Sequence, residues 1–392
     1  MRHVSDLHGE PGRRESAFMT AHRETARREP DRWTHMTLED VAKAARVSPA
    51  TASRVLNGSA TVHAELAARV HEAASRLEYT PNAHAQALAG SSHRTVGVIC
   101  HDISDPYFAA IARGVMQVAA DEGMLVLLAS TFRRFDREIE YVSMLRAQRA
   151  PAILLIGSGI EDRRWERRMA AELNPYLRGG GRVAVISRHR GLRVDSVLPE
   201  NRAGAAALAA ALAGMGHRRF AVLTGPRVLT TVADRLGGFR DGLAAAGVHL
   251  ADEDVVEGAF TRDGGYDAMT RLIEVGLPAT CVFAVTDVMA IGACAAIRDR
   301  GLSVPGDVSV AGFDDIPGVR DLTPPLTTVA LPLERLGERA LRLALDGKTG
   351  KRAQNIRMAG EVVIRASTAT LPTTEGLAMT VRTSPSDTEV AS

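Results

Sequence analysis

The sequence of 392 residues lacks any run of about eighteen or more uncharged apolar residues, the length that a membrane-spanning helix needs. Residues 1–35 mix arginine with acidic residues instead of placing a basic start before an apolar stretch, so they predict no secretory signal. We therefore expect a chain that stays in the cytoplasm. The ordinary apolar fraction, 45%, and the charged fraction, 24%, indicate a globular protein of two or three domains.

Cysteine is scarce. The three cysteines are Cys100, Cys281 and Cys294, an odd number without CxxC spacing. The first two lie in apolar runs that predict buried strands. We expect core thiols, and neither disulfide bonds nor a metal site.

Catalytic clusters are missing as well. The sequence shows no Ser/His/Asp, Cys/His or metal-spaced group, and its 12 histidines are scattered. Gly157-Ser-Gly159 follows a predicted strand as a phosphate loop would, but no third glycine follows at the required spacing. We expect no enzyme and no cofactor, with a nucleotide-dependent doubly wound protein as the alternative. The net charge of +2 is too small to indicate a nucleic-acid partner, so such a partner has to be inferred from local residues.

Short apolar runs alternate with amphipathic helical stretches from Thr95 onward. This alternation predicts parallel sheets with crossover helices, and it restarts after Asn201, which suggests two lobes with a cleft between them. Ligands of such sheets bind beyond the carboxyl ends of the strands. The predicted strands are Val96–Cys100, Leu125–Leu128, Ala152–Ile156, Val183–Ile186, Phe220–Leu223, Asp254–Val256, Cys281–Val285 and Val308–Ala311.

A small helical segment precedes these strands. Thr37 is a good N-cap for a helix over Leu38–Ala45, and Ser48 followed by Pro49 begins a second helix that ends at Leu56. The second helix places short side chains and Arg54 on one face. A helix, a tight turn and a helix with such a face fit the major groove of DNA.

The run from Thr37 to Gly58 resembles the helix-turn-helix of the lactose-repressor (LacI/GalR) family, and residues 79–90 resemble the hinge helix of that family. The resemblance implies a transcription regulator that binds a palindromic operator as a homodimer. We expect a repressor, with an activator as the alternative. The resemblance places Pro49, Ala50 and Arg54 at base edges. It places phosphate contacts at Ser48, Thr51, Ser53, Asn57 and His63, and adds the hinge residues Asn82, Ala85 and Leu88 to the DNA-binding set.

Two of these residues carry specific expectations. Arg54 can donate two hydrogen bonds to guanine, a contact worth about 1–3 kcal/mol of discrimination. Leu88 matches the residue that wedges between base pairs at the operator centre and kinks the duplex. The helical run of the hinge, residues 83–90, is shorter than the roughly 12 residues that a lone helix needs, so we expect it to order only on DNA. The alternative for each residue taken alone is ordinary: an arginine in solvent and a leucine in a core.

Residues 95 to 368 resemble the periplasmic-binding-protein-like core of the same family. The resemblance implies an effector site in which aromatic rings stack on the ligand, Arg235 reaches hydroxyl or carboxylate groups and Asp314 accepts hydroxyl hydrogen bonds. The alternatives are that Asp287 and Asp315 cap helices, and that Phe260 and Phe313 belong to the core. The predicted effector residues are Asp105, Tyr107, Phe108, Arg235, Phe260, Thr286, Asp287 and Asp314.

The resemblance also implies how the parts work together. Effector binding would reorient the two lobes and change the spacing of the paired hinge helices. We expect a sugar as effector, with a nucleoside or purine as the alternative, and leave inducer and co-repressor both open. A stand-alone sugar-binding protein would need export. The predicted domains are a disordered extension, 1–35; the DNA-binding head, 36–80; hinge and linker, 81–94; the two-lobed dimerisation core, 95–370; and a disordered tail, 371–392.

Overall fold

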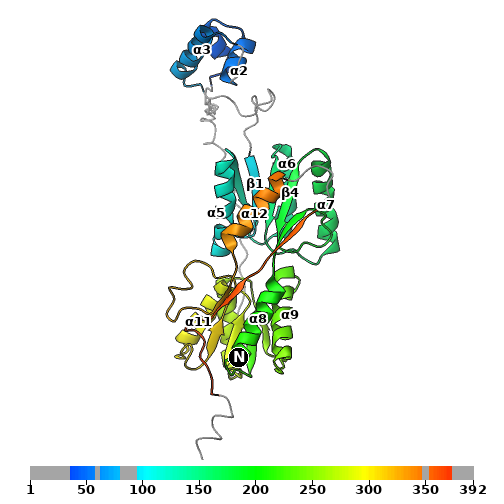
Figure 1. Ribbon diagram of the computed structural model, residues 1–392, viewed down its shortest axis with the longest axis vertical. Helices are drawn as coiled ribbons and strands as arrows, with labels where there is room; N and C mark the ends of the chain where they lie inside the picture. Colours follow the sequence, from blue (N-terminus) through cyan, green and yellow to red (C-terminus); the bar gives the residue numbers. More distant parts are fainter. Residues whose placement is uncertain (1–35, 58–61, 80–94, 347–352, 373–392) are drawn as a thin grey trace, which may run out of the picture. The chain divides into compact units, whose positions relative to one another are not determined.

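The computed structural model (Figure 1) describes residues 36–57, 62–79, 95–346 and 353–372. The contacts divide the chain into two compact units, residues 1–92 and 93–392. The predicted disordered extension, the hinge and nearly all of the predicted tail lie outside the described residues. The two units are therefore considered one at a time.

The described residues of the first unit form a bundle of three helices, α1 (Leu38–Ala45), α2 (Pro49–Leu56) and α3 (Ala64–Arg76). Thr37 and Asp40 form a capping box at the start of α1, and Ser48 accepts a hydrogen bond from the backbone N–H of Thr51 at the start of α2. Both helices thus begin where the sequence predicts. Their inner faces pack on α3 in a small core of Val41, Ala42, Ala45, Ala52, Val55, Val70, Ala73 and Ala74.

The second unit contains a six-stranded parallel sheet, which forms lobe 1. Its strands are β1 (Thr95–Cys100), β2 (Leu125–Ser130), β3 (Ala152–Ile156), β4 (Arg182–Ile186), β5 (Asp195–Pro199) and β11 (Asn355–Met358), in the order β11-β5-β4-β3-β1-β2. Helices α5 (Pro106–Asp121), α6 (Phe135–Ala147), α7 (Arg163–Arg178) and α12 (Leu333–Asp346) cover it.

Alternate residues of this sheet belong to two different apolar clusters. Val98 and Leu154 pack with α5 and α12, whereas Ile99 and Ile153 pack with α6 and α7. A strand that is covered on both faces reads as a continuous apolar run, which is the pattern that the sequence shows there. Lobe 1 is therefore a doubly covered parallel sheet.

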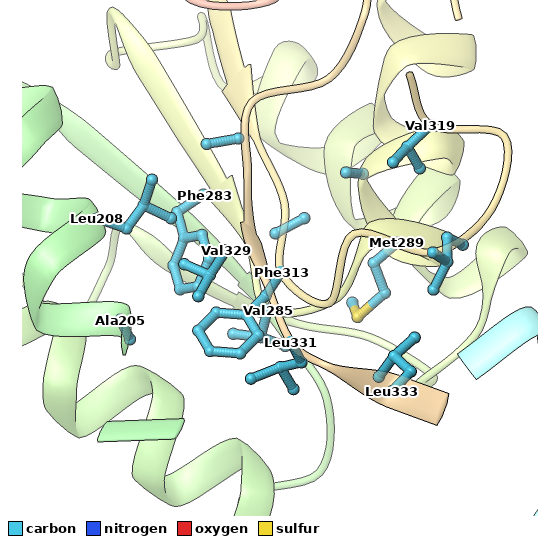
Figure 2. Close-up of a cluster of buried hydrophobic side chains, with 14 of the residues drawn as sticks. Ala205, Leu208, Phe283, Val285, Met289, Phe313, Val319, Val329, Leu331 and Leu333 are labelled. Atoms are coloured by element: carbon cyan, nitrogen blue, oxygen red, sulfur yellow. The ribbon is translucent and has the colours of Figure 1, made fainter. Parts of the chain in front are cut away.

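Lobe 2 holds a four-stranded parallel sheet in the order β7-β6-β8-β9. The chain enters it after β5, leaves it through β10 (Thr328–Ala330) and returns through β12 (Glu361–Val363), which pairs with β10 as an antiparallel ribbon. Figure 2 shows the core beside this ribbon, where Phe313, Val329 and Leu331 pack near Ala205 and Leu208 of α8. The elements are α8 (Asn201–Gly214), β6 (Phe220–Thr224), α9 (Thr230–Ala245), β7 (Val255–Glu257), α10 (Arg262–Glu274), β8 (Cys281–Ala284), α11 (Asp287–Asp299), β9 (Ser309–Ala311), β10 (Thr328–Ala330) and β12 (Glu361–Val363).

The predicted architecture, a helical head followed by a two-lobed α/β core, is confirmed. Each of the eight predicted strands has a counterpart within two residues at either end. Cys100 and Cys281 are buried as free thiols, and Cys294 is half-buried on α11. Among the helices of the described ranges, none is long and apolar enough to cross a membrane.

Candidate functional sites

Helix α2 presents an exposed polar face over a buried anchor. Ala52 and Val55 are buried against α1 and α3, which fixes the rotation of the helix. On the opposite side Ser48, Pro49, Ala50 and Arg54 are exposed, and Thr51, Ser53 and Asn57 are half-buried. The structure thus gathers these predicted DNA-binding residues on one surface.

Local hydrogen bonds hold the polar groups of this face in place. Within the described part of the chain, Arg54 bonds only to its own helix, from Nε to the carbonyl of Ala50 at 3.4 Å, so the end of its guanidinium group is free there to donate elsewhere. Asn57 Nδ2 donates to Ser53 Oγ at 3.2 Å. His63 is exposed at the start of α3 and its side chain makes no capping hydrogen bond. Asn82, Ala85 and Leu88 lie outside the described residues.

A cavity opens between the lobes of the second unit, at the carboxyl ends of the strands. Its volume, counted over the positions open to the centre of a water-sized sphere, is about 20 Å³. Seven of the eight predicted effector residues line it: Asp105, Tyr107, Phe108, Arg235, Phe260, Thr286 and Asp314. The wall is completed by His101, Gly157, Ser158 and Thr231.

Arg235 and Asp314 form a buried ion pair in this wall. Arg235 Nη2 lies 2.5 Å from one carboxylate oxygen of Asp314 and Nη1 lies 3.2 Å from the other. The same guanidinium group donates from Nε to Asn201 Oδ1 at 2.9 Å and from Nη1 to the carbonyl of Val285 at 2.7 Å, and it stacks on Phe313 at 4.0 Å. The side chains are 2% and 4% exposed. The protein itself thus engages four of the five N–H donors of Arg235.

The protonation of the wall follows from its burial. Burial raises the pKa of Asp314, and Arg235 opposes that rise. Because Arg235 binds both carboxylate oxygens, we infer that Asp314 is ionised and that the pair is neutral as a unit. Burial, assisted by the nearby Asp314 carboxylate, also raises the pKa of Tyr107, so its phenol stays protonated and keeps a hydrogen to donate.

The lobe 1 side of the cavity is built on the start of α5 and the end of β1. Asp105 is the N-cap of α5 and accepts a hydrogen bond from Tyr107 N at 3.0 Å. His101 follows β1 directly, donates from Nε2 to the buried carboxylate of Glu138 at 3.0 Å, and lies at 5.7 Å from the ring of Phe108. Gly157 leaves room for it, because a Cβ there would lie 2.7 Å from His101 Nε2.

Asp287 lies behind this wall. It is fully buried at the start of α11, where Oδ1 accepts from Thr328 Oγ1 at 2.6 Å and Oδ2 accepts from Ile316 N at 2.9 Å. Burial raises its pKa to about 6. Thr286 does line the cavity, but its hydroxyl also caps α11 by accepting from Met289 N. The structure thus gives Asp287 the task of tying β10 and the loop after Asp314 to α11.

Comparison with known proteins assigns both units. Residues 37–82 match the model of bacterial regulatory proteins of the lacI family, and residues 209–368 match a periplasmic binding protein-like domain. The regulator DegA of Bacillus subtilis is 32% identical over 86% of this chain and 99% of its own length, and GalR of Escherichia coli is 34% identical over 79% and 88%. The chain belongs to the lacI family of bacterial regulatory proteins.

Solved structures of the family agree with the fold. The lac repressor dimer bound to operator and an anti-inducer superposes with a TM-score of 0.73 at 26% identity, over 86% of this chain and 99% of the repressor. The complex of CelR with cellobiose gives a TM-score of 0.62 at 29% identity, over 85% of this chain and all of CelR. The named relatives are transcriptional regulators, so the expectation of a lacI-family regulator rather than an enzyme is confirmed.

Four wall residues of this lacI-family core were missed from the sequence. His101 follows β1, Gly157 and Ser158 follow β3, and Thr231 lies at the start of α9. The rule that ligands bind beyond the ends of parallel strands identifies the first three positions. The sequence of Gly157-Ser-Gly159 suggests part of a phosphate loop instead of an effector site. Thr231 carries no sequence signal beyond its place at the start of a helix.

Proposed function

We propose that this chain represses transcription by binding a palindromic operator as a homodimer, and that a small molecule bound between the lobes of the core changes its operator affinity. The observation that carries the proposal is the exposed polar face of α2 on a helix-turn-helix whose sequence matches the lacI family. The lac repressor offers a precedent as a dimer on its operator. Because the target is DNA, we place the protein in the cytoplasm.

The core supports an effector of sugar type. Its cavity combines aromatic side chains with buried polar groups at strand ends, which is the usual composition of a small-molecule site. CelR and another lacI-family regulator were solved with cellobiose and with ribose. The relatives also include the transcriptional repressors PurR of Proteus mirabilis and CytR of Escherichia coli, whose names do not point to a sugar, so a nucleoside or purine remains the alternative effector. We therefore propose Asp105, Tyr107, Phe108, Arg235, Phe260, Thr286 and Asp314 as the residues that face the effector.

The test is the selection of bound duplexes from a randomised DNA pool by the purified full chain. We expect an enriched palindrome whose binding weakens with salt, since phosphate contacts release counterions. Arg54→Ala should cost about 1–3 kcal/mol and relax the sequence preference at one symmetric pair of positions. Leu88→Ala should weaken binding through the operator centre.

Arg167→Ala is the matched control. Arg167 is exposed on α7 in the core, so its loss removes the same charge without touching the head. If both arginine substitutions weakened operator binding equally, the effect of Arg54→Ala would come from the loss of net charge and not from a base contact. If the pool yields no palindrome, the operator-binding proposal is wrong.

A further inference from the structure

A second and larger cavity adjoins the first in the cleft. Its volume by the same measure is about 520 Å³, and Asp105 lines both cavities. Lobe 1 contributes Asp102, Asp105 and Arg133, and lobe 2 contributes residues at the start of α10 and on α11. An effector too large for the inner cavity thus has room to extend outward past Asp105.

Arg133 stands at the boundary of the two cavities. Its guanidinium carbon lies 5.2 Å above the ring of Phe260, a wall residue of the inner cavity. Its side chain is 23% exposed, yet Nε and Nη1 are both buried and find no hydrogen-bond partner among the described residues. Nη2 makes one long contact, 3.5 Å to Asp105 Oδ2. An arginine stays protonated even here, so the group is a buried cation with unused donors.

The other arginines of the cleft differ from Arg133. Arg235 uses its donors on Asn201, Val285 and Asp314. Arg262 pairs with the adjacent Asp263 at 2.9 Å and stacks on Tyr266 at 5.5 Å. Among the arginines that line either cavity, Arg133 is the one with buried N–H donors that have no hydrogen-bond partner among the described residues.

The neighbouring acids give Arg133 one ion-pair contact, the 3.5 Å from Nη2 to Asp105 Oδ2, and no acceptor for Nε or Nη1. Asp105 Oδ1 caps α5, and Asp102 Oδ1 accepts from both the backbone N–H and the hydroxyl of Ser104, at 3.0 and 2.7 Å. One oxygen of each carboxylate is thus engaged with its own loop. Leaving charged donors buried without a hydrogen-bond partner costs free energy, which a further anionic acceptor would recover.

The backbone directs Arg133 into the cleft at a cost. Phe132 and Arg133 have φ angles of 51° and 60°, two consecutive non-glycine residues in the left-handed region. Arg133 N donates to the carbonyl of His101 at 3.3 Å, while Phe132 is 66% exposed. Such conformations concentrate at ligand sites, where the surrounding structure holds them.

From these observations we infer that the effector carries a carboxylate or phosphate group, and that Arg133 binds this group. The inference rests on the proposed function, because it names the chemistry of the molecule that the cleft accepts. The sugar-like part of the effector would face the inner wall, and its anionic group would lie at Arg133. The expected class is a sugar acid or a sugar phosphate rather than a neutral sugar.

The test compares charged and neutral members of matched pairs on the full chain. The probes are glucose, glucose 6-phosphate and gluconate, together with inorganic phosphate against chloride at equal ionic strength. Binding is read from the melting temperature and from the fluorescence of Trp165. That side chain is 5% exposed and contacts Phe135, which in turn contacts the cavity residue His101. A Trp33→Phe background removes the other tryptophan of the sequence.

The variants are Arg133→Gln, Arg133→Lys and, as control, Arg134→Gln. Arg134 is exposed, pairs with Asp136 and lines neither cavity. At least one anionic probe should bind the starting protein, Arg134→Gln and, more weakly, Arg133→Lys. Arg133→Gln should bind the same probe about tenfold or more weakly, the loss of a charge-assisted hydrogen bond.

Three outcomes would overturn the inference: no anionic probe binds, anions bind Arg133→Gln as well as the control, or neutral sugars bind more tightly than their anionic partners. Operator selection with the same preparations keeps the two proposals apart. Arg133→Gln should select the same palindrome as the starting protein. If the starting protein selects an operator but binds no anionic probe, the effector chemistry is rejected, whereas failure to select an operator in every variant rejects the regulator.

Discussion

The buried pair of Arg235 and Asp314 dominates the residue-scale energetics of the cavity. Removing two ions from water costs several kcal/mol each, and their attraction offsets this only with good geometry and further hydrogen bonds. Arg235 has both, since it binds Asp314 through two nitrogens and also reaches Asn201 and Val285. Removing one partner leaves the other buried without a counter-ion.

Arg235→Leu is therefore expected to lower the free energy of unfolding by about 3–5 kcal/mol. In this variant, protonation of Asp314 removes the free-energy cost of burying its charge without a counter-ion. Its pKa in the folded variant lies above its unfolded value, so the loss of stability should be smaller at acidic than at alkaline pH. Urea unfolding at several pH values measures both effects.

The exposed pair of Arg202 and Asp241 provides the control. These side chains are 58% and 54% exposed and lie 2.6 Å apart. Arg202→Leu should change stability by no more than about 1 kcal/mol. Equal losses in the two leucine variants, or a loss at Arg235 that ignores pH, would contradict the account of the buried pair.

The sequence distinguishes the types of residue at the cavity better than their orientation. Asp287 and Asp314 both follow predicted strands, and both were expected to face the effector. Asp287 turns away because Thr328, 41 residues later in the chain, occupies one of its oxygens. The sequence did not predict Arg133 as a site residue, because its approach to Phe260 depends on a left-handed turn that no local sequence pattern indicates.

At the scale of elements, glycines set how closely the helices of lobe 2 approach. A Cβ at Gly265 of α10 would lie 2.2 Å from the carbonyl oxygen of Met289 on α11, and one at Gly292 of α11 would lie 1.9 Å from that of Arg262 on α10. The two helices thus interlock through backbone contacts. Helix α10 begins just after Phe260, and Thr286 is the N-cap of α11. Because both residues line the inner cavity, the close approach of the two helices also positions this part of its wall.

Gly292→Ala is expected to destabilise the protein by about 1–3 kcal/mol or more, because the added methyl group meets rigid backbone. Gly214→Ala is the matched control, since Gly214 is exposed at the end of α8, within a helix, and its Cβ would meet nothing within 4 Å. That substitution should be neutral or stabilising by about 0.5–1 kcal/mol. Thermal unfolding of both variants decides the point, and similar melting temperatures would argue against the interlock.

Strands could be predicted where their burial leaves a clear apolar run in the sequence, and they were missed where it does not. The central strands of both sheets are continuous apolar runs and were located to within two residues. Strands β5 and β11 pair with each other at the side of the lobe 1 sheet, and their sequences, DSVLP and NIRM, mix polar with apolar residues. Their pairing joins segments about 160 residues apart, which no local pattern can indicate.

At the scale of the core unit, the lobes are held together in a closed arrangement. Thr230 N donates to the carbonyl of Gly159, and Thr231 N donates to Ser158 Oγ. Arg188 of lobe 1 binds Asp234 of lobe 2 through two hydrogen bonds, at 2.8 and 3.2 Å. The inner cavity beside these contacts is narrow, about 20 Å³ for the centre of a water-sized sphere. We therefore expect an effector of sugar size to enter by separation of the lobes.

A disulfide between the lobes would prevent this separation. Ile160 and Leu229 form an isolated antiparallel bridge across the cleft, and the hydrogen bonds run between their neighbours. Opposed residues of this kind have Cα atoms about 4.5 Å apart, within the range that a disulfide accepts. Both side chains are buried. Of the native cysteines, Cys294 is the one that is only half-buried, and Cys294→Ala removes it as a competing partner for disulfide formation.

We expect the oxidised Ile160→Cys/Leu229→Cys protein to bind its operator but to ignore the effector, and reduction to restore the response. The reason is that a ligand can shift the equilibrium only toward a conformation that the protein can reach. The measurement is operator affinity with and without effector, before and after reduction, with each single cysteine variant as control. An oxidised protein that still responds would mean that the effector enters without separating the lobes at this bridge, and would move the hinge of the response elsewhere in the core.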